Sequence, residues 1–176
     1  MPGKASAALV IDASIARAAG ETEHPVSSAC RSFLQEVLKI CHRVVLTPEI
    51  SAEYKEHRSY FARKWLASMW ARKKVLRPGP VENAGLRQTI HSLDLTDSVR
   101  EAILKDIHLV EAAFATDHAV ASLDDTARRY LRQITEHVRS LRSLVWVNPA
   151  KENEHASDWL RQGAKADEER QLGFNP

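Results

Sequence analysis

Short apolar runs alternate with longer amphipathic stretches along this chain of 176 residues. Four runs have the length and character of buried β-strands: AALVI (7–11), RVVL (43–46), AVASL (119–123) and SLVWVN (143–148). Between them, apolar residues recur every three or four positions, which is typical of helices packed on a core. The alternation predicts an α/β class with a three-layer fold, in which helices flank a central, mostly parallel sheet.

Capping residues and prolines indicate where the helices begin. Ser27 and Ser28 are expected to cap a helix that carries both cysteines, Cys30 and Cys41, on its apolar face as small core residues. Thr47 is expected to cap a helix with Pro48 at its first position, where a missing N–H costs nothing. Further helices are predicted over 13–20, 59–74, 81–93, 97–114 and 126–141.

Composition and charge set the class of protein. A hydrophobic content of 44% is that of a globular domain, which we expect over residues 1–148, followed by a polar helical tail over 149–176 anchored by Trp159 and Leu160. No apolar run approaches the roughly 18 residues of a membrane span. The apolar stretch near the start is too short for a signal peptide, so a cytoplasmic protein is predicted.

Four carboxylates stand where a site is expected. Asp12 and Asp124 each follow an apolar run, and ligands of parallel sheets bind beyond the carboxyl ends of strands. Glu53 and Asp106 lie on the apolar faces of their helices, directed toward the same region. Clustered carboxylates repel one another unless a cation joins them, and Mg²⁺ and Mn²⁺ prefer oxygen ligands. The pattern therefore predicts a metal site that polarises a phosphodiester and activates water.

Each carboxylate also has an ordinary explanation. An aspartate after a strand is often only a helix cap, which applies to Asp12, Asp124 and above all Asp125. Glu53 lies near the edge of a helical face, and Asp106 would be neutralised by a buried arginine partner. The convergence of all four on one sheet edge favours the metal site.

These residues resemble the motifs of PIN-domain nucleases over about residues 7–148. The motifs are LVIDAS (9–14), TPEISAEY (47–54), DIHLVEAA (106–113) and ASLDD (121–125). Carried over residue by residue, the family's acids match Asp12, Glu53, Asp106 and Asp124, and its small hydroxyl residues match Ser14 and Ser122. Two positions stay open, because Glu49 is an alternative to Glu53 and Asp125 an alternative to Asp124 as metal ligand.

The resemblance implies a Mg²⁺- or Mn²⁺-dependent endoribonuclease. RNA is the implied substrate, with single-stranded DNA as the alternative for a DNA-directed nuclease of the same fold. Because many small members of the family are toxins, an antitoxin-like protein is an implied partner, and the sequence does not choose between a monomer and a homodimer. A catalytically silent PIN-like module that binds RNA or protein is the alternative from another functional class.

One segment is strongly basic although the net charge is only +2. Eight lysines and arginines lie between residues 55 and 77, against a single acid, Glu56. We expect nucleic-acid backbone contacts from this segment, with Trp65 or Trp70 stacking on unpaired bases. The predicted nucleic-acid contacts are Arg58, Arg63, Lys64, Arg72, Lys73 and Lys74, together with Ser14 and Ser122 beside the acidic residues. The alternative is that both tryptophans pack the helix onto the core and the charges are solvated.

Overall fold

A central sheet of five strands organises the computed structural model, which describes residues 6–176. The strand order is β3-β2-β1-β4-β5, and all four strand pairings are parallel. The strands are β1 (Ala8–Ile11), β2 (Arg43–Val45), β3 (Val75–Leu76), β4 (Ala119–Ala121) and β5 (Val145–Val147). The predicted α/β class and parallel sheet are confirmed. Only β3 was not predicted, because this half-buried edge strand has two residues and lies in no longer apolar run.

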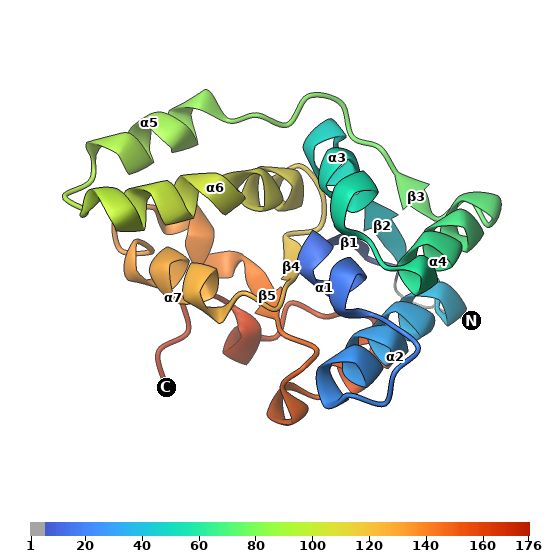
Figure 1. Ribbon diagram of the computed structural model, residues 1–176. Coiled ribbons are helices and arrows are strands. Elements are labelled where there is room, and N and C mark those ends of the chain that lie inside the picture. The colour runs from blue at the N-terminus through green and yellow to red at the C-terminus, as the bar shows by residue number, and fades with distance from the viewer. Residues whose placement is uncertain (1–5) are drawn as a thin grey trace.

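Helices cover both faces of this sheet (Figure 1). From β1 the chain first moves outward to β2 and β3, then crosses back to β4 and β5. Right-handed crossovers in opposite directions place their helices on opposite faces, so α2 and α4 lie on one side and α6 and α7 on the other. The helices are α1 (Ala13–Ala18), α2 (Pro25–Lys39), α3 (Pro48–His57), α4 (Tyr60–Ala71), α5 (Ala84–Ser92), α6 (Asp97–Phe114), α7 (Asp125–Gln133) and α8 (Ala156–Arg161).

Several predicted helix ends are confirmed. The hydroxyl of Thr47 accepts a hydrogen bond from the Ile50 backbone N–H at the start of α3, and the hydroxyl of Thr96 accepts one from Val99 at the start of α6. The prediction for α2 was wrong. This helix begins at Pro25, and Ser27 lies inside it, where its hydroxyl accepts from the Gly20 backbone N–H. Proline suits the first helical position, so it displaced the serines as the start.

Two further expectations were wrong. Cys41 lies beyond the end of α2 and is exposed, whereas Cys30 is buried inside the helix as expected. The helix expected over 126–141 ends at Gln133 and is followed by a short 3-10 turn, η1 (Arg139–Ser143). In the turn that follows, the Thr135 hydroxyl donates to the Arg132 carbonyl of the last turn of α7 at 2.8 Å.

The C-terminal segment packs against the helices that precede it. Trp159 and Leu160 of α8 are buried, as predicted, and α8 lies against α2. The ring of His42 joins this segment to the sheet: its Nδ1 accepts from the Ala7 backbone N–H at 3.1 Å, and its Nε2 donates to the Leu160 carbonyl at 2.7 Å. Short 3-10 turns, η2 (Glu152–Glu154) and η3 (Glu168–Arg170), flank α8.

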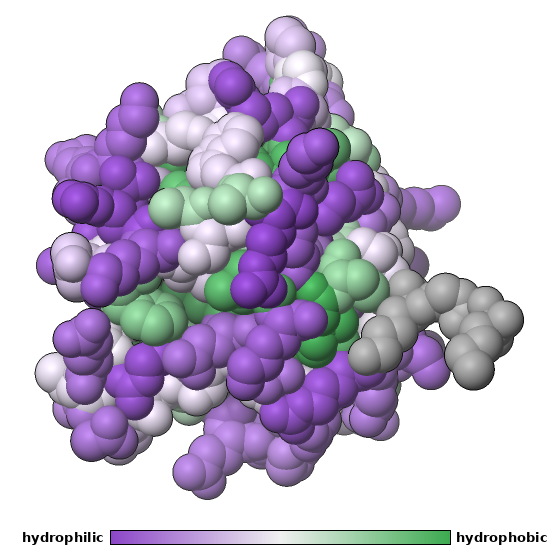
Figure 2. All heavy atoms as spheres, turned by 90° about the vertical axis from the view of Figure 1, so that its right-hand side faces the viewer, coloured by the Kyte–Doolittle hydropathy of each residue, from purple (hydrophilic) through white to green (hydrophobic). Residues whose placement is uncertain are grey.

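The surface beside α2, α4 and β3 is mainly hydrophilic, with a smaller apolar area at its centre (Figure 2). Within residues 6–176, no helix combines the length and apolar character needed to cross a lipid bilayer. Residues 1–5, part of the start on which the signal-peptide expectation was based, lie outside the described residues.

Candidate functional site

The candidate site lies where β1 and β4 end side by side. The chain leaves these neighbouring strands toward opposite edges of the sheet, which is the topological switch point where parallel sheets bind ligands. Asp12 follows β1, and its backbone N–H donates to the Ala121 carbonyl of β4 at 2.9 Å. A cleft of about 240 Å³ opens here. It is lined by all four predicted acids together with three cationic or titratable neighbours, namely Asp12, Glu53, Asp106, Asp124, Arg17, His57 and Lys105.

Two hydroxyl groups hold the Asp12 carboxylate. Ser14 and Ser122 both donate to its Oδ2 at 2.6 Å. The same hydroxyls also accept, Ser14 from the Leu123 backbone N–H and Ser122 from that of Asp124. The two serines assigned through the resemblance therefore orient one carboxylate and tie the first turn of α1 to the loop after β4. Oδ1 of Asp12 has no hydrogen-bond partner among the described residues and remains available.

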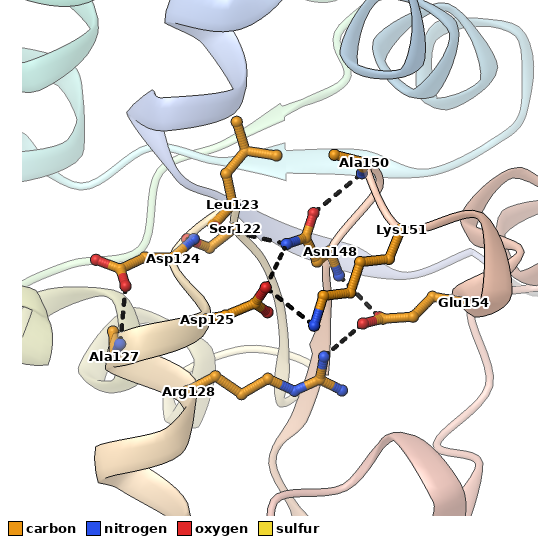
Figure 3. Close-up of polar contacts among 10 residues, drawn as sticks. All are labelled: Ser122, Leu123, Asp124, Asp125, Ala127, Arg128, Asn148, Ala150, Lys151 and Glu154. Carbon is orange, nitrogen blue, oxygen red and sulfur yellow. Dashed lines mark hydrogen bonds and ion pairs between the residues drawn. The ribbon is translucent and has the colours of Figure 1, made fainter. Parts of the chain in front are cut away.

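The adjacent Asp124 and Asp125 have different surroundings (Figure 3). Asp124 lines the acidic cleft and caps α7, because its Oδ1 accepts from the Ala127 backbone N–H at 2.8 Å. Asp125 Oδ2 lies 2.9 Å from Lys151 Nζ and 3.2 Å from Asn148 Nδ2. Asp125 does not line the cleft, so the structure brings Asp124 together with the other three acids and leaves Asp125 outside.

Glu53 has a partner that the sequence did not reveal. His108 lies on α6 two residues after Asp106. It is buried, and its Nε2 lies 3.1 Å from Glu53 Oε2. Its Nδ1 lies 3.1 Å from the Lys105 carbonyl oxygen. The ring of His108 thus bridges the Glu53 carboxylate and the backbone of α6. Only tertiary contact between α3 and α6 distinguishes this histidine from the others in the chain.

Tyr54 fixes the position of α3 beside the cleft. It is fully buried, and its hydroxyl donates to the Ile11 carbonyl, one residue before Asp12, at 2.7 Å. Burial raises the pKa of Tyr54, and the nearby Asp12 and Glu53 charges raise it further, so the phenol stays a donor. Glu53 is thereby held toward the cleft. Glu49, the alternative position, does not line it.

Asp106 is the most perturbed acid of the cleft. Its pKa is raised to about 6, first by burial and then by the Asp12 and Asp124 charges, while Lys105 and His108 act in the opposite direction. No described residue forms a hydrogen bond or ion pair with its carboxylate. The arginine partner that would have explained it belongs to Glu111, one turn further along α6, which Arg87 binds with two hydrogen bonds of 2.7 and 2.8 Å.

The residues of the basic segment 55–77 differ in exposure and contacts. Arg63 and Lys64 lie on the exposed face of α4, where both stack against the Tyr60 ring. Trp70 is 47% exposed and lines a groove with Arg58, Lys55 and Arg77. Trp65 is buried, and its indole N–H donates to the Leu34 carbonyl at 2.6 Å, so of these two tryptophans it is Trp70 that has an exposed ring.

The three consecutive cations 72–74 end α4. Arg72 and Lys73 are exposed, and Lys73 has a left-handed backbone with φ 56°. Lys74 turns inward, and its ammonium donates to the Val37, Leu38 and Ile40 carbonyls at the end of α2. Lys74 therefore closes the C-terminal end of a helix, where a cation is favourable.

Among residues 6–176, no group of three or more His, Cys, Asp or Glu side chains is arranged so that it could hold a metal ion. Comparisons of the chain with protein-family models, curated proteins and solved structures found no match.

Proposed function

We propose that this protein is a metal-dependent endoribonuclease that hydrolyses phosphodiester bonds at the acidic cleft. The observation that carries the proposal is the convergence of four carboxylates, from the ends of β1 and β4 and from α3 and α6, on one cleft at the switch point. Asp12, Glu53, Asp106 and Asp124 would hold Mg²⁺ or Mn²⁺. The resemblance of their motifs to PIN-domain nucleases supports the same assignment.

The donor set fits a hard divalent cation. All four ligands are carboxylates, the donors that Mg²⁺ and Mn²⁺ favour. Asp12 and Asp124 raise the pKa of Asp106, which shows that the acids repel one another, and a cation would turn this repulsion into attraction. Bound there, the cation would polarise a phosphodiester and activate water. The side chains that line the cleft would need to move inward to coordinate it.

The remaining polar residues have roles that follow from their positions. Ser14 and Ser122 hold Asp12 in one orientation, and His108 does the same for Glu53. Arg17 and Lys105 line the cleft and are suited to bind the non-bridging oxygens of a phosphate. Each group acts by positioning, so that the scissile phosphate meets charges held in fixed places.

The RNA strand would approach from the α4 side. Arg58, Arg63 and Lys64 neutralise its phosphates, with Arg72 and Lys73 at the end of the helix. Trp70 offers a stacking surface for an unpaired base. The test is RNA affinity after the double reversal Arg63→Glu/Lys64→Glu, with the exposed pair Arg139→Glu/Lys165→Glu as the control of equal charge change. Equal affinities in the two variants would remove α4 from the binding surface.

Cleavage assays test the function itself. The purified chain is incubated with RNA and with single-stranded DNA in Mn²⁺, in Mg²⁺ and in EDTA. Asp106→Asn is compared with Asp94→Asn, which removes the same charge from an exposed loop. We expect cutting that requires the metal, persists in Asp94→Asn and falls by at least about a hundredfold in Asp106→Asn. Cutting that is equal in both variants would show that another site or a contaminant is responsible.

A catalytically silent RNA- or protein-binding module is the second candidate. The observation favouring it is that three of the four acids already have protein partners: Asp12 the two serines, Glu53 His108, and Asp124 the first turn of α7. RNA binding without cleavage in any metal would select this candidate. If cleavage occurs, replacing the 2′-hydroxyl at the cut site separates an RNA-directed from a DNA-directed enzyme.

A further inference from the structure

A second polar pocket lies beside α7, apart from the acidic cleft. It has a volume of about 470 Å³, and its cationic lining comes from two parts of the chain. Arg128, Arg129 and Arg132 come from α7, and Lys151 and Arg170 from the C-terminal segment. Five cationic residues face three acids here, so the lining carries an excess of positive charge. We refer to this space as the α7 pocket.

Three of the five cations of the α7 pocket have an acid partner, whereas Arg129, which lies over the Tyr130 ring, and Arg132 do not. Arg128 Nη1 lies 2.5 Å from Glu154 Oε1, and Lys151 Nζ lies 2.9 Å from Asp125 Oδ2 (Figure 3). The guanidinium of Arg132 forms no hydrogen bond or ion pair with any described residue. The Nε atoms of Arg128 and Arg132 are both buried without a partner.

This arrangement is unfavourable as it stands. Arg128 and Arg132 are four residues apart on one helix, so their like charges lie on the same face and repel. Burial lowers the pKa of Arg132, and Arg128 lowers it further, while Glu154 compensates only in part. A partly buried guanidinium without an acceptor is costly, which indicates that an anion completes the site.

We propose that the α7 pocket binds a phosphate group, either free or at the end of a nucleotide chain. The guanidinium of Arg132 presents its outer N–H donors in a planar fork that matches two phosphate oxygens. The neighbouring Arg128 stays held by Glu154, whose other oxygen accepts from the Asn148 backbone N–H at 2.9 Å, so the wall of the pocket is fixed before the ligand arrives.

The α7 pocket is separate from the acidic cleft but close to it in the chain. Asp124 lines the cleft and its neighbour Asp125 lines the α7 pocket, on either side of the start of α7. Phosphate binding here involves no divalent cation and none of the four cleft acids. It therefore does not depend on the proposed nuclease activity.

Phosphate titration tests the proposal. Inorganic phosphate is titrated into the full chain in chloride buffer with EDTA, and binding is followed by calorimetry. Arg132→Gln is compared with Arg139→Gln, which removes the same charge from an exposed residue outside the α7 pocket. We expect saturable binding that weakens by at least about tenfold in Arg132→Gln and is unchanged in Arg139→Gln. Arg170→Gln, from a different segment, should also weaken it.

The source of the phosphate is separated by a second titration. A short RNA with a 5′-phosphate and the same RNA with a 5′-hydroxyl are compared, again in EDTA so that cleavage is off. Preference for the 5′-phosphate that disappears in Arg132→Gln assigns the α7 pocket to an RNA end, whereas saturable binding of inorganic phosphate alone assigns it to free phosphate. If neither phosphate nor the phosphorylated RNA binds, or if Arg132→Gln binds as tightly as Arg139→Gln, the proposal is overturned.

Discussion

The hydroxyl of Ser122 donates to Oδ2 of Asp12 at 2.6 Å, although 110 positions separate the two residues in the chain. Ser122 is fully buried, and its hydroxyl also accepts from the Asp124 backbone N–H. Its oxygen thus links the ends of β1 and β4 at the acidic cleft.

Replacing Ser122 tests this link. Ser122→Ala leaves a buried N–H and one carboxylate bond unsatisfied, so we expect unfolding to require about 1–3 kcal/mol less free energy. Urea denaturation measures the change, and the exposed Ser140→Ala should alter it by less than about 0.5 kcal/mol. If the cleft cleaves RNA, Ser122→Ala should also lower the turnover rate, whereas the Michaelis constant should change little.

The raised pKa of Asp106 predicts a pH-dependent stability. Because its pKa rises from 3.8 to about 6 on folding, the native state binds this proton more tightly than the unfolded chain. The stabilising contribution is present below pH 4 and is lost as the pH rises through about 6. Asp106→Asn should therefore be the more stable protein at pH 7 in EDTA, by about 1–2 kcal/mol after allowance for solvent screening.

Denaturation at several pH values checks this prediction. The difference between Asp106→Asn and the unaltered chain should be near zero at pH 4 and reach a plateau above pH 6. Asp94→Asn, in an exposed loop, should show no such pH dependence. A difference that is constant from pH 4 to pH 8 would contradict the assigned environment of Asp106.

Divalent metal should reverse this order of stability. An ion held by Asp12, Glu53, Asp106 and Asp124 binds the folded chain only, and at a hundred times its dissociation constant it would add about 2.7 kcal/mol. We expect Mn²⁺ to raise the melting temperature of the unaltered chain by several degrees and to leave Asp106→Asn unchanged. NaCl at the same ionic strength serves as the control for general charge screening.

Alanine substitution of the two tryptophans of α4 should affect different properties, stability for Trp65 and RNA binding for Trp70. Trp65 is buried and bonded to the Leu34 carbonyl, so Trp65→Ala should cost about 3–5 kcal/mol of stability. Trp70 is exposed, so Trp70→Ala should change stability by less than about 1 kcal/mol but weaken binding of single-stranded RNA by about tenfold. Thermal unfolding and fluorescence anisotropy with labelled RNA measure the two effects. Unaltered RNA affinity in Trp70→Ala would exclude stacking on this residue.

Lys73 and Lys74 form a second matched pair. Lys74→Met removes the ammonium that donates to three carbonyls at the end of α2, of which that of Leu38 keeps a second donor, Arg72, and we expect a loss of about 1–3 kcal/mol. Lys73 has positive φ at the turn after α4, where its backbone N–H bonds to the Trp70 carbonyl, so Lys73→Gly should gain about 1 kcal/mol by relieving that conformation. Chemical denaturation should show a lower free energy of unfolding for Lys74→Met and a higher one for Lys73→Gly.

The spacing of apolar residues along the chain predicted most of the fold, because apolar residues recur where a strand or helix is buried. The runs ending before Asp12 and Asp124 became adjacent parallel strands, and Thr47 and Thr96 began their helices as expected. The errors arose where local signals competed. Pro25 rather than the following serines began α2, and Cys41 fell just past its end, because apolar spacing continued after the hydrogen-bonded helix had stopped.

The sequence by itself determined which carboxylates follow strands and which share the apolar face of a helix, since both depend on local spacing. Tertiary structure alone decided that Asp124 rather than Asp125 lines the acidic cleft, that His108 pairs with Glu53, and that Arg132 has no partner. Adjacent residues at a helix start point in different directions, and a side chain's partner depends on which distant elements the sheet order brings beside it. Local spacing carries the burial pattern, but only the assembled chain sets the distances on which pairing and charge depend.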